Sequence, residues 1–431
     1  MFKRFPSCCE PLMPISAGRD YSHRSGRVNC GGRAFGKGVP MRFRVPGWCI
    51  LVRRSTRPAA TDRRGGGVPM KKAATAACLA ATMAWSASTS GAEKTGLGAS
   101  DRVALDRRDL EDQCDLGIEK ALTYLAATQQ KDGSWGAGYG RNTAVVSLAV
   151  LAFLAKGHLP DEAPHGQVVN RAIDFVLAHQ HTNGLLFTEA GGPMYSHGIG
   201  TLMLAEVVGM TAGERERRVR EALARAVKLI LDAQRIKQAD TRFRGGWRYQ
   251  HTSPDSDLSV TGWCLMALKA AKNAGAVVPV EAINDAIDYV KRSFCPGGGF
   301  AYQPGAGPSV AMTATGVLCL QIAGYHLLAG SGKRYHPEAM ASGEWLVKHP
   351  VGSYGGGHFH YMVYYVAQAM WQLGGTYWDF WQPNFEKLVL ANQNADGSWP
   401  AVQAEIGPVF STSMTVLALA VKYGYLPIYQ R

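Results

Sequence analysis

The sequence contains no Cys-x-x-Cys pair, so a structural zinc ribbon is excluded. Five of the nine cysteines precede residue 93, and Cys114, Cys264, Cys295 and Cys319 follow. Cys264 and Cys319 fall inside apolar runs with a helical period. For these two residues a buried free thiol is the favoured state, even in an exported compartment that permits disulfide bonds.

Net charge is also missing from most of the chain. The full sequence carries a formal charge of +13, but residues 1–69 hold 14 Lys and Arg against 3 Asp and Glu. Residues 93–431 hold 30 basic and 30 acidic side chains. Because binding to a polyanion depends on clustered positive charge, we expect no nucleic-acid partner.

The N-terminal part of the sequence has the features of an export signal. Residues 70–92 read MKKAATAACLAATMAWSASTSGA, with a basic start, an apolar middle too short to span a bilayer comfortably, and a small-residue end. We therefore expect translation to start at Met70, residues 1–69 to be a wrongly assigned upstream extension, and the mature protein to be exported without a transmembrane helix. A basic arm followed by an internal apolar segment is the alternative. We expect residues 93–110 to be a linker.

Residues 111–431 repeat a unit of roughly fifty residues, which is typical of stacked helix pairs. Each unit has an amphipathic helix, a Gly/aromatic loop and a second helix that is apolar nearly all round. Aligning the second helices places six apolar residues in equivalent positions: Leu151, Leu204, Leu268, Ile322, Met370 and Leu419. Six units follow from this count.

Six amphipathic and six apolar helices alternate along the chain, so the apolar set can form an inner layer and the amphipathic set an outer one. Closing the array into a ring leaves neither end with an uncovered apolar face. The sequence therefore predicts an all-α fold, a six-helix-pair α/α toroid (α6/α6 barrel). An open superhelix is the structural alternative.

The loops between paired helices share a Gln…Gly-Gly/Ser-aromatic pattern. In the first unit Gln130 precedes Gly133-Ser134-Trp135, and in the last unit Gln393 precedes Gly397-Ser398-Trp399. We expect the Gln amide to bond backbone groups left unpaired at the helix end, and the Trp ring to cover it. This role is structural.

These loop elements resemble the Gln–Trp repeats of squalene–hopene cyclases. The six-unit plan is similar to that of prenyltransferase/squalene-oxidase repeat proteins, and the resemblance covers roughly Cys114 to the C-terminus. It implies a single toroid of the terpene cyclase/mutase type.

The resemblance draws attention to Asp255-Ser256-Asp257-Leu258. Class II terpene cyclases carry an Asp-x-Asp-Asp motif whose middle aspartate protonates an alkene or epoxide, and Asp257 occupies that position, with Asp255 in support. Leu258 stands where the family has its last Asp. From its place at a helix start, we expect the helix dipole to lower the pKa of Asp257. The alternative role of Asp257 is a helix N-cap, with Asp255 shaping the preceding turn.

Other candidate side chains lie near loop–helix junctions or on the apolar helices. Aromatic rings there can line a central cavity and stabilise a carbocation, or they can simply fill the core. A carboxylate inside an apolar helix is expected to be paired or to face a polar cavity. The candidate cavity residues are Trp247, Tyr249, Trp263, Tyr302, His197, Glu206, His360 and Tyr364.

Metal chemistry has little support in the sequence. His358 and His360 with Asp255 or Asp257 offer no defined third ligand, so we expect neither a metal nor a cofactor. The loop Gly298–Gly305 resembles that of zinc prenyltransferases but lacks the Asp and Cys ligands, and the Cys-Gly-Glu-Gln sequence of toroidal thioester proteins does not occur.

The resemblance implies a terpene-cyclase-like toroid, an isomerase whose axial cavity binds an apolar isoprenoid-like ligand. Two alternatives remain open. One is a non-catalytic exported binding or scaffold module that uses the ring face. The other is a glycan-active enzyme, because exported α/α toroids also act on polysaccharides. The repeat count does not distinguish these functions, and it leaves the oligomeric state open.

Overall fold

The computed structural model describes residues 99–136, 138–188, 191–323, 336–402 and 406–430. The chain divides into two units, and every described residue belongs to the second, Gly91–Arg431. The expected upstream extension and signal peptide lie outside the described residues, so export stays a prediction. The first helix, α1, begins at Ala99, and the later part of the segment expected to be a linker is therefore helical.

The described residues form twelve α-helices and no β-strand. The odd-numbered helices are α1 (Ala99–Thr128), α3 (Gly166–Ala178), α5 (Gly213–Gln234), α7 (Val280–Arg292), α9 (Pro337–Lys348) and α11 (Gly375–Leu390). The even-numbered helices are α2 (Thr143–Ala155), α4 (Pro193–Val207), α6 (Leu258–Asn273), α8 (Val310–Ile322), α10 (Phe359–Leu373) and α12 (Pro408–Ala420).

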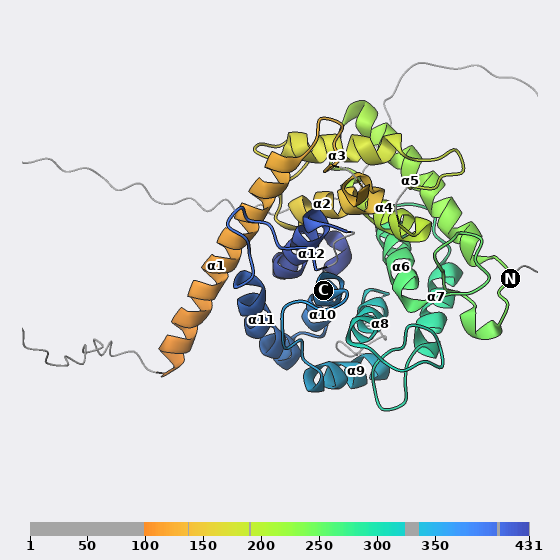
Figure 1. The fold of residues 1–431 in the computed structure, drawn as a ribbon. Helices are drawn as coiled ribbons and strands as arrows, with labels where there is room; N and C mark the ends of the chain where they lie inside the picture. The colour runs from red at the N-terminus through yellow and green to blue at the C-terminus, as the bar shows by residue number, and fades with distance from the viewer. Residues whose placement is uncertain (1–98, 137, 189–190, 324–335, 403–405, 431) are drawn as a thin grey trace, which may run out of the picture. The chain divides into compact units, whose positions relative to one another are not determined.

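The even-numbered helices form a closed inner ring (Figure 1). Each packs against the next, from α2 through α4, α6, α8 and α10 to α12, and α12 packs against α2. The odd-numbered helices cover this ring from outside, and α11 contacts α1 across the closure. The predicted α/α toroid of six helix pairs is confirmed, and the contact between α12 and α2 excludes the open superhelix.

The two layers follow from the two kinds of helix sequence. All thirteen residues of α2 are buried, as expected for a helix that is apolar all round and packed on several sides. Helix α7 instead buries one stripe and exposes its charged residues, because only one of its faces meets the inner ring. Burial of apolar surface, at roughly 25 cal/mol per Å², is what holds the layers together.

The loops are fixed by two repeated contacts. First, the indole N–H of the loop tryptophan donates to a carbonyl of the preceding outer helix, in the pairs Trp135–Leu125 (2.7 Å), Trp247–Ile230 (2.8 Å) and Trp399–Val389 (2.8 Å). Second, a glutamine amide donates to the loop glycine carbonyl and to a carbonyl of the next outer helix. We call this second contact the glutamine clamp. It occurs at Gln129, Gln180, Gln234 and Gln393.

The prediction that Gln130 makes the loop contact in the first unit is wrong. In the first unit it is Gln129, and not Gln130, whose amide reaches the carbonyls of Gly133 (3.2 Å) and Val168 (2.9 Å). Gln130 lies one residue beyond the register that the other units share. At Gly133 the backbone has φ +90°, and a Cβ atom would lie 2.1 Å from the carbonyl oxygen of Arg171. Only glycine fits this approach.

Polar contacts join the two ends of the repeat array. The amide of Gln393 donates to the carbonyl of Gly117 in α1 at 2.8 Å. The Tyr423 hydroxyl, just after α12, donates to the Asp115 carboxylate of α1, and Arg107 of α1 pairs with Asp379 of α11 at 3.8 Å. The ring is therefore closed by polar contacts as well as by apolar packing.

The C-terminal segment closes one end of the ring axis. Ile428 and Tyr429 of its short helix η4 (Pro427–Tyr429) are buried, and Figure 1 shows the C-terminus inside the ring. The Tyr429 carbonyl accepts a hydrogen bond from Gln372 near the end of α10, at 2.8 Å, and its hydroxyl contacts that of Tyr364. The other end of the axis, where the inner helices begin, is therefore the place to look for a binding site.

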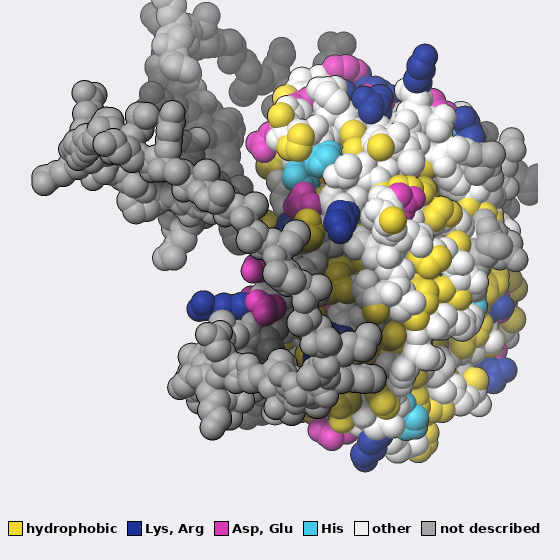
Figure 2. Space-filling view, turned by 60° about the vertical axis from the view of Figure 1, so that its left-hand side comes forward, with side chains coloured by type: hydrophobic (Ala, Val, Ile, Leu, Met, Phe, Trp, Pro, Cys, Tyr) yellow, Lys and Arg dark blue, Asp and Glu magenta, His cyan; other side chains and the backbone are white. Residues whose placement is uncertain are grey.

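The surface of the described ring has charges of both signs. In Figure 2 basic and acidic side chains are scattered, and apolar side chains are spread over the face between them. Among the described helices, none combines the length and the apolar character that crossing a membrane requires.

Candidate functional site

A cavity of about 640 Å³ lies at the end of the ring where the inner helices begin, and we call it the axial cavity. Its lining comes from the first two turns of all six inner helices and from the loops that precede them. The volume lies within the range of small-molecule sites. The toroid therefore offers a ligand site that every repeat helps to build.

The wall of the axial cavity is mainly aromatic and aliphatic, with hydroxyl groups in between. Aromatic side chains that line it include Tyr249, Trp263, Tyr302, Tyr361 and Phe410. The Tyr249 and Tyr302 hydroxyls contact each other, and Ser259 contacts the hydroxyls of both Tyr195 and Tyr361, the latter at 2.6 Å. Such a wall suits a largely apolar ligand with a few polar atoms.

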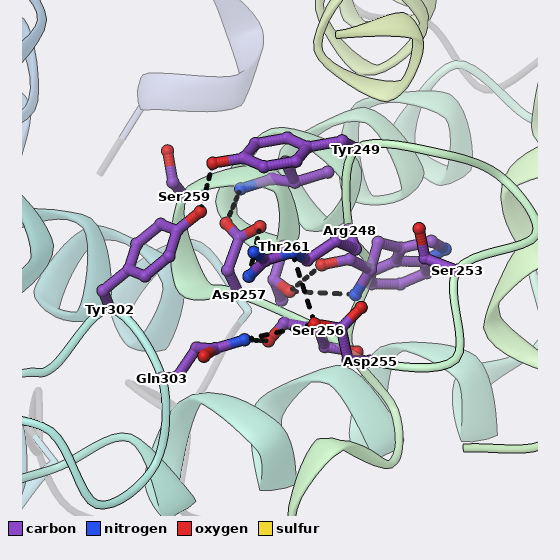
Figure 3. A network of polar contacts seen from close by, with 12 residues as sticks. Arg248, Tyr249, Ser253, Asp255, Ser256, Asp257, Ser259, Thr261, Tyr302 and Gln303 are labelled. Atoms are coloured by element: carbon purple, nitrogen blue, oxygen red, sulfur yellow. Dashed lines mark hydrogen bonds and ion pairs between the residues drawn. The ribbon is translucent and has the colours of Figure 1, made fainter. Parts of the chain in front are cut away.

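Arg248 connects this wall to the two aspartates (Figure 3). Its Nε lies 3.4 Å from Asp255 Oδ2, and its Nη1 lies 3.7 Å from Asp257 Oδ2. The guanidinium carbon also lies 4.8 Å from the ring centre of Tyr249 and 5.6 Å from that of Tyr302. The two carboxylates and the arginine form one cluster directly behind the aromatic wall.

Asp257 is the N-cap of α6. Its Oδ1 accepts a hydrogen bond from the Val260 N–H at 2.8 Å, so the capping alternative holds. The side chain is fully buried, and its Oδ2 has no hydrogen-bond partner among the described residues. Asp257 does not line the cavity itself. Its neighbours Arg248, Ser259 and Tyr302 do.

The expected lowering of the Asp257 pKa is wrong in its net direction. Burial raises this pKa from 3.8 to about 6, although the Val260 hydrogen bond and the Arg248 charge act to lower it. Removal from water therefore outweighs the helix terminus and the counter-ion. As a result, Asp257 keeps its proton to a higher pH than an aspartate in water does.

Asp255 is more accessible than Asp257, with 33% of its side chain exposed. It belongs to the loop before α6, which a second loop holds in place: the Gln303 amide donates to the Ser256 carbonyl at 2.9 Å, and the Leu258 N–H donates to the Tyr302 carbonyl at 2.8 Å. These contacts fix the positions of both aspartates relative to Tyr302.

His197 and His360 do not line the axial cavity; they hold backbone in place. His197 Nδ1 accepts the Leu186 N–H, and its Nε2 donates to the Ala226 carbonyl, each at 3.1 Å. His360 lies between the Thr415 hydroxyl (3.0 Å) and the Pro400 carbonyl (3.2 Å). Burial lowers the pKa of each imidazole to about 4, so both are neutral.

Three more candidates lie outside the cavity lining. Trp247 makes the loop contact described above, and Tyr364 is buried beneath Trp263. Glu206 is near the other end of α4, against the backbone of Ile428. Of the residues selected from the sequence, Tyr249, Trp263 and Tyr302 line the axial cavity, and Asp255 and Asp257 lie behind it.

Arg248, Tyr195 and Ser259 were not selected from the sequence. The sequence does indicate a role for Arg248, because it stands between two aromatic residues and close to two aspartates that need a counter-ion. It does not indicate a role for Ser259 or Tyr195, since a hydroxyl near a helix start is common. Within the described part of the chain, no group of His, Cys, Asp and Glu is arranged to hold a metal ion.

Comparison with known proteins agrees with this architecture. Residues 241–405 match the prenyltransferase alpha-alpha toroid domain family. A drimenyl diphosphate synthase from Streptomyces showdoensis is 26% identical over 203 residues, which are 47% of this chain and 35% of that protein. The chain thus spans about a third of the length of this curated relative.

Two solved structures are similar at low sequence identity. An alpha-1,6-mannanase variant from a Salegentibacter species, in complex with alpha-1,6-mannotriose, has a TM-score of 0.51 at 12% identity, covering 71% of this chain and 99% of that one. The type II terpene cyclase MstE from Scytonema has a TM-score of 0.48 at 16% identity, covering 73% of this chain and 100% of that one. At these identities the likeness concerns the fold alone. The chain therefore has the α/α toroid fold, and its residues 241–405 are similar to the prenyltransferase alpha-alpha toroid domain family.

Proposed function

We propose that the axial cavity binds an isoprenoid chain and that Asp257 starts its cyclisation or isomerisation by protonating an alkene. The observation that carries the proposal is the buried Asp257 carboxyl, set behind a cavity wall of aromatic rings. The names of a drimenyl diphosphate synthase and a terpene cyclase among the similar proteins support an isoprenoid as the ligand class.

The wall chemistry supports the ligand class. Apolar surface binds a hydrocarbon chain by the hydrophobic effect, and the ring faces of Tyr249, Trp263 and Tyr302 can stabilise a passing carbocation. Closure of the opposite end of the axis by the C-terminal segment limits water entry from that side.

The proposed step balances as an isomerisation. The O–H bond of protonated Asp257 breaks, a C–H bond forms at one alkene carbon, and a tertiary carbocation remains on the other. Neighbouring double bonds of the chain then close rings, a carbon-bound proton is lost to water, and the Asp257 carboxylate takes a proton back from water. No co-reactant is needed. Because Tyr302 and Arg248 now stand between Asp257 and the cavity, the ligand must displace part of this wall to reach the acid.

The glycan alternative loses support at this cavity. Glycoside hydrolysis needs two carboxyl groups that flank the scissile bond. Among the described residues that line the axial cavity, none is Asp or Glu. The similarity to a mannanase concerns the fold alone.

The test is to incubate the full-length protein with farnesyl diphosphate, geranylgeranyl diphosphate and squalene, and to analyse the lipid extract by mass spectrometry. Asp257→Asn is the key variant, because asparagine keeps the N-cap while removing the acid. Asp255→Asn removes only the supporting carboxylate, so it should lower the amount of product without abolishing it. An isomeric product that disappears only with Asp257→Asn supports the proposal. Tight binding without any product would leave a binding module and contradict the catalytic step, and absence of binding would contradict the ligand class.

A further inference from the structure

The axial cavity ends at a definite depth. On α8, α10 and α12 the lining stops at the third residue of each helix, with Met312, Tyr361 and Phe410. On the other three inner helices it continues about one turn further, to Leu148, Ile199 and Trp263, which we call the cavity floor. Trp263 is the largest of the three.

The space beneath Trp263 is filled with aromatic rings. Tyr364 stacks on it with ring centres 5.3 Å apart and planes 11° apart, and Tyr365 meets it edge-on at 5.5 Å. Tyr429 of the C-terminal segment lies next, with its ring centre 6.4 Å from that of Tyr364. All three tyrosines are buried and lie outside the cavity lining.

Contacts beneath and beside Trp263 hold the cavity floor in place. The Tyr364 and Tyr429 hydroxyls contact each other, and Gln372 holds the Tyr429 carbonyl at 2.8 Å. From the side, α4 approaches so closely at Gly198 that a Cβ atom there would lie 3.1 Å from Trp263 Cβ. Trp263 is therefore in contact with packed rings below and with backbone at its side, and one part of it faces the cavity.

We infer that Trp263 sets the longest isoprenoid chain that the axial cavity accepts, an inference that rests on the proposed isoprenoid function. Replacing Trp by Ala removes the nine ring atoms, while an isoprene unit adds five carbons. Packed cores relax only partly around a lost side chain, so most of this volume stays open. The optimum chain length should rise by about one isoprene unit. Burial of the added carbons favours the longer chain, so the preference between adjacent lengths should change by at least about tenfold.

The experiment measures the affinity of the full-length protein for geranyl, farnesyl, geranylgeranyl and geranylfarnesyl diphosphates by calorimetry. The variants are Trp263→Ala and Trp263→Phe, with Phe153→Ala as the matched control. Phe153 is fully buried on α2 outside the cavity lining, so its loss loosens the core without deepening the cavity. Trp263→Ala should move the optimum to a longer chain, Trp263→Phe should move it less in the same direction, and Phe153→Ala should leave it in place.

The outcomes separate the inference from the proposed function. If wild type binds these diphosphates and neither Trp263 variant changes the length preference, the inference is wrong and the proposed ligand class stands. An equal shift in Phe153→Ala would also overturn the inference, because general loosening would then be the cause. If Trp263→Ala does not fold, Trp263→Phe decides the question. If wild type binds none of the four, the proposed isoprenoid function fails, and the inference fails with it.

Discussion

Replacing Glu206 by Gln should stabilise the protein at neutral pH. Glu206 is 4% exposed in α4, and its Oε2 has no hydrogen-bond partner within the described part of the chain. Burial raises its pKa from 4.5 to about 8, against a lowering by the Ile428 backbone hydrogen bond. The folded protein therefore keeps Glu206 neutral at pH 7, whereas the unfolded chain ionises it.

The sign of the pH dependence follows from these two pKa values. This contribution to stability is fully present below pH 4.5, where both states hold the proton. Between pH 4.5 and about 8 only the folded state holds it, so the free energy of unfolding falls as pH rises, by about 1.4 kcal/mol per pH unit. At pH 7 the loss reaches about 3 kcal/mol. Glutamine is neutral in both states and avoids this loss, so Glu206→Gln should be more stable by a similar amount.

The assay is urea unfolding of wild type and Glu206→Gln at pH 5, 6, 7 and 8. The stability difference between the two proteins should grow with pH and level off near pH 8. Glu386→Gln is the control, because Glu386 is also buried but pairs with Lys422 at 3.0 Å. Breaking that pair should destabilise the protein, by about 3–5 kcal/mol. A difference between wild type and Glu206→Gln that does not change with pH would refute the reasoning.

Three further outcomes are expected. Gln129→Ala should lower the free energy of unfolding by about 1–3 kcal/mol, because it removes the glutamine clamp. Gln130→Ala should change it by less than about 0.5 kcal/mol. Equal effects of the two variants in chemical denaturation would contradict the assigned register. Arg248→Met should raise the pKa of Asp257 further above 6, because the nearby positive charge is lost, and carbon NMR of the carboxyl during a pH titration measures this. Asp257→Ala should cost about 1 kcal/mol of stability through loss of the N-cap while Asp257→Asn keeps it, and equal stability of the two variants would show that the cap is unimportant.

The sequence was sufficient to predict the toroid. The apolar helices repeat at a near-constant period and are apolar on every face, so only an inner layer can bury them. The last apolar helix, α12, then has to cover the first, α2. The glutamine in the first loop was assigned one residue too late, because two glutamines are adjacent and only the contact with Val168 in the next helix distinguishes them.

The site was harder to predict, because it depends on which way side chains point from loops. His197 and Glu206 looked functional, since polar side chains are rare in apolar helices, yet His197 satisfies backbone groups and Glu206 faces the C-terminal segment. Asp257 has a raised pKa because the fold buries it, which its sequence neighbours do not reveal. Arg248 matters because the loop brings it between the two aspartates and the cavity wall.

The central claim is that Asp257 protonates an isoprenoid in the axial cavity, and the most direct measurement is turnover in deuterium oxide. The proton on Asp257 exchanges with solvent, so an alkene protonated by it must acquire one deuterium that mass spectrometry of the product detects. The account predicts an isomeric product with one added deuterium, formed by wild type and absent with Asp257→Asn. A product that carries no deuterium, or one that Asp257→Asn forms equally well, would contradict it.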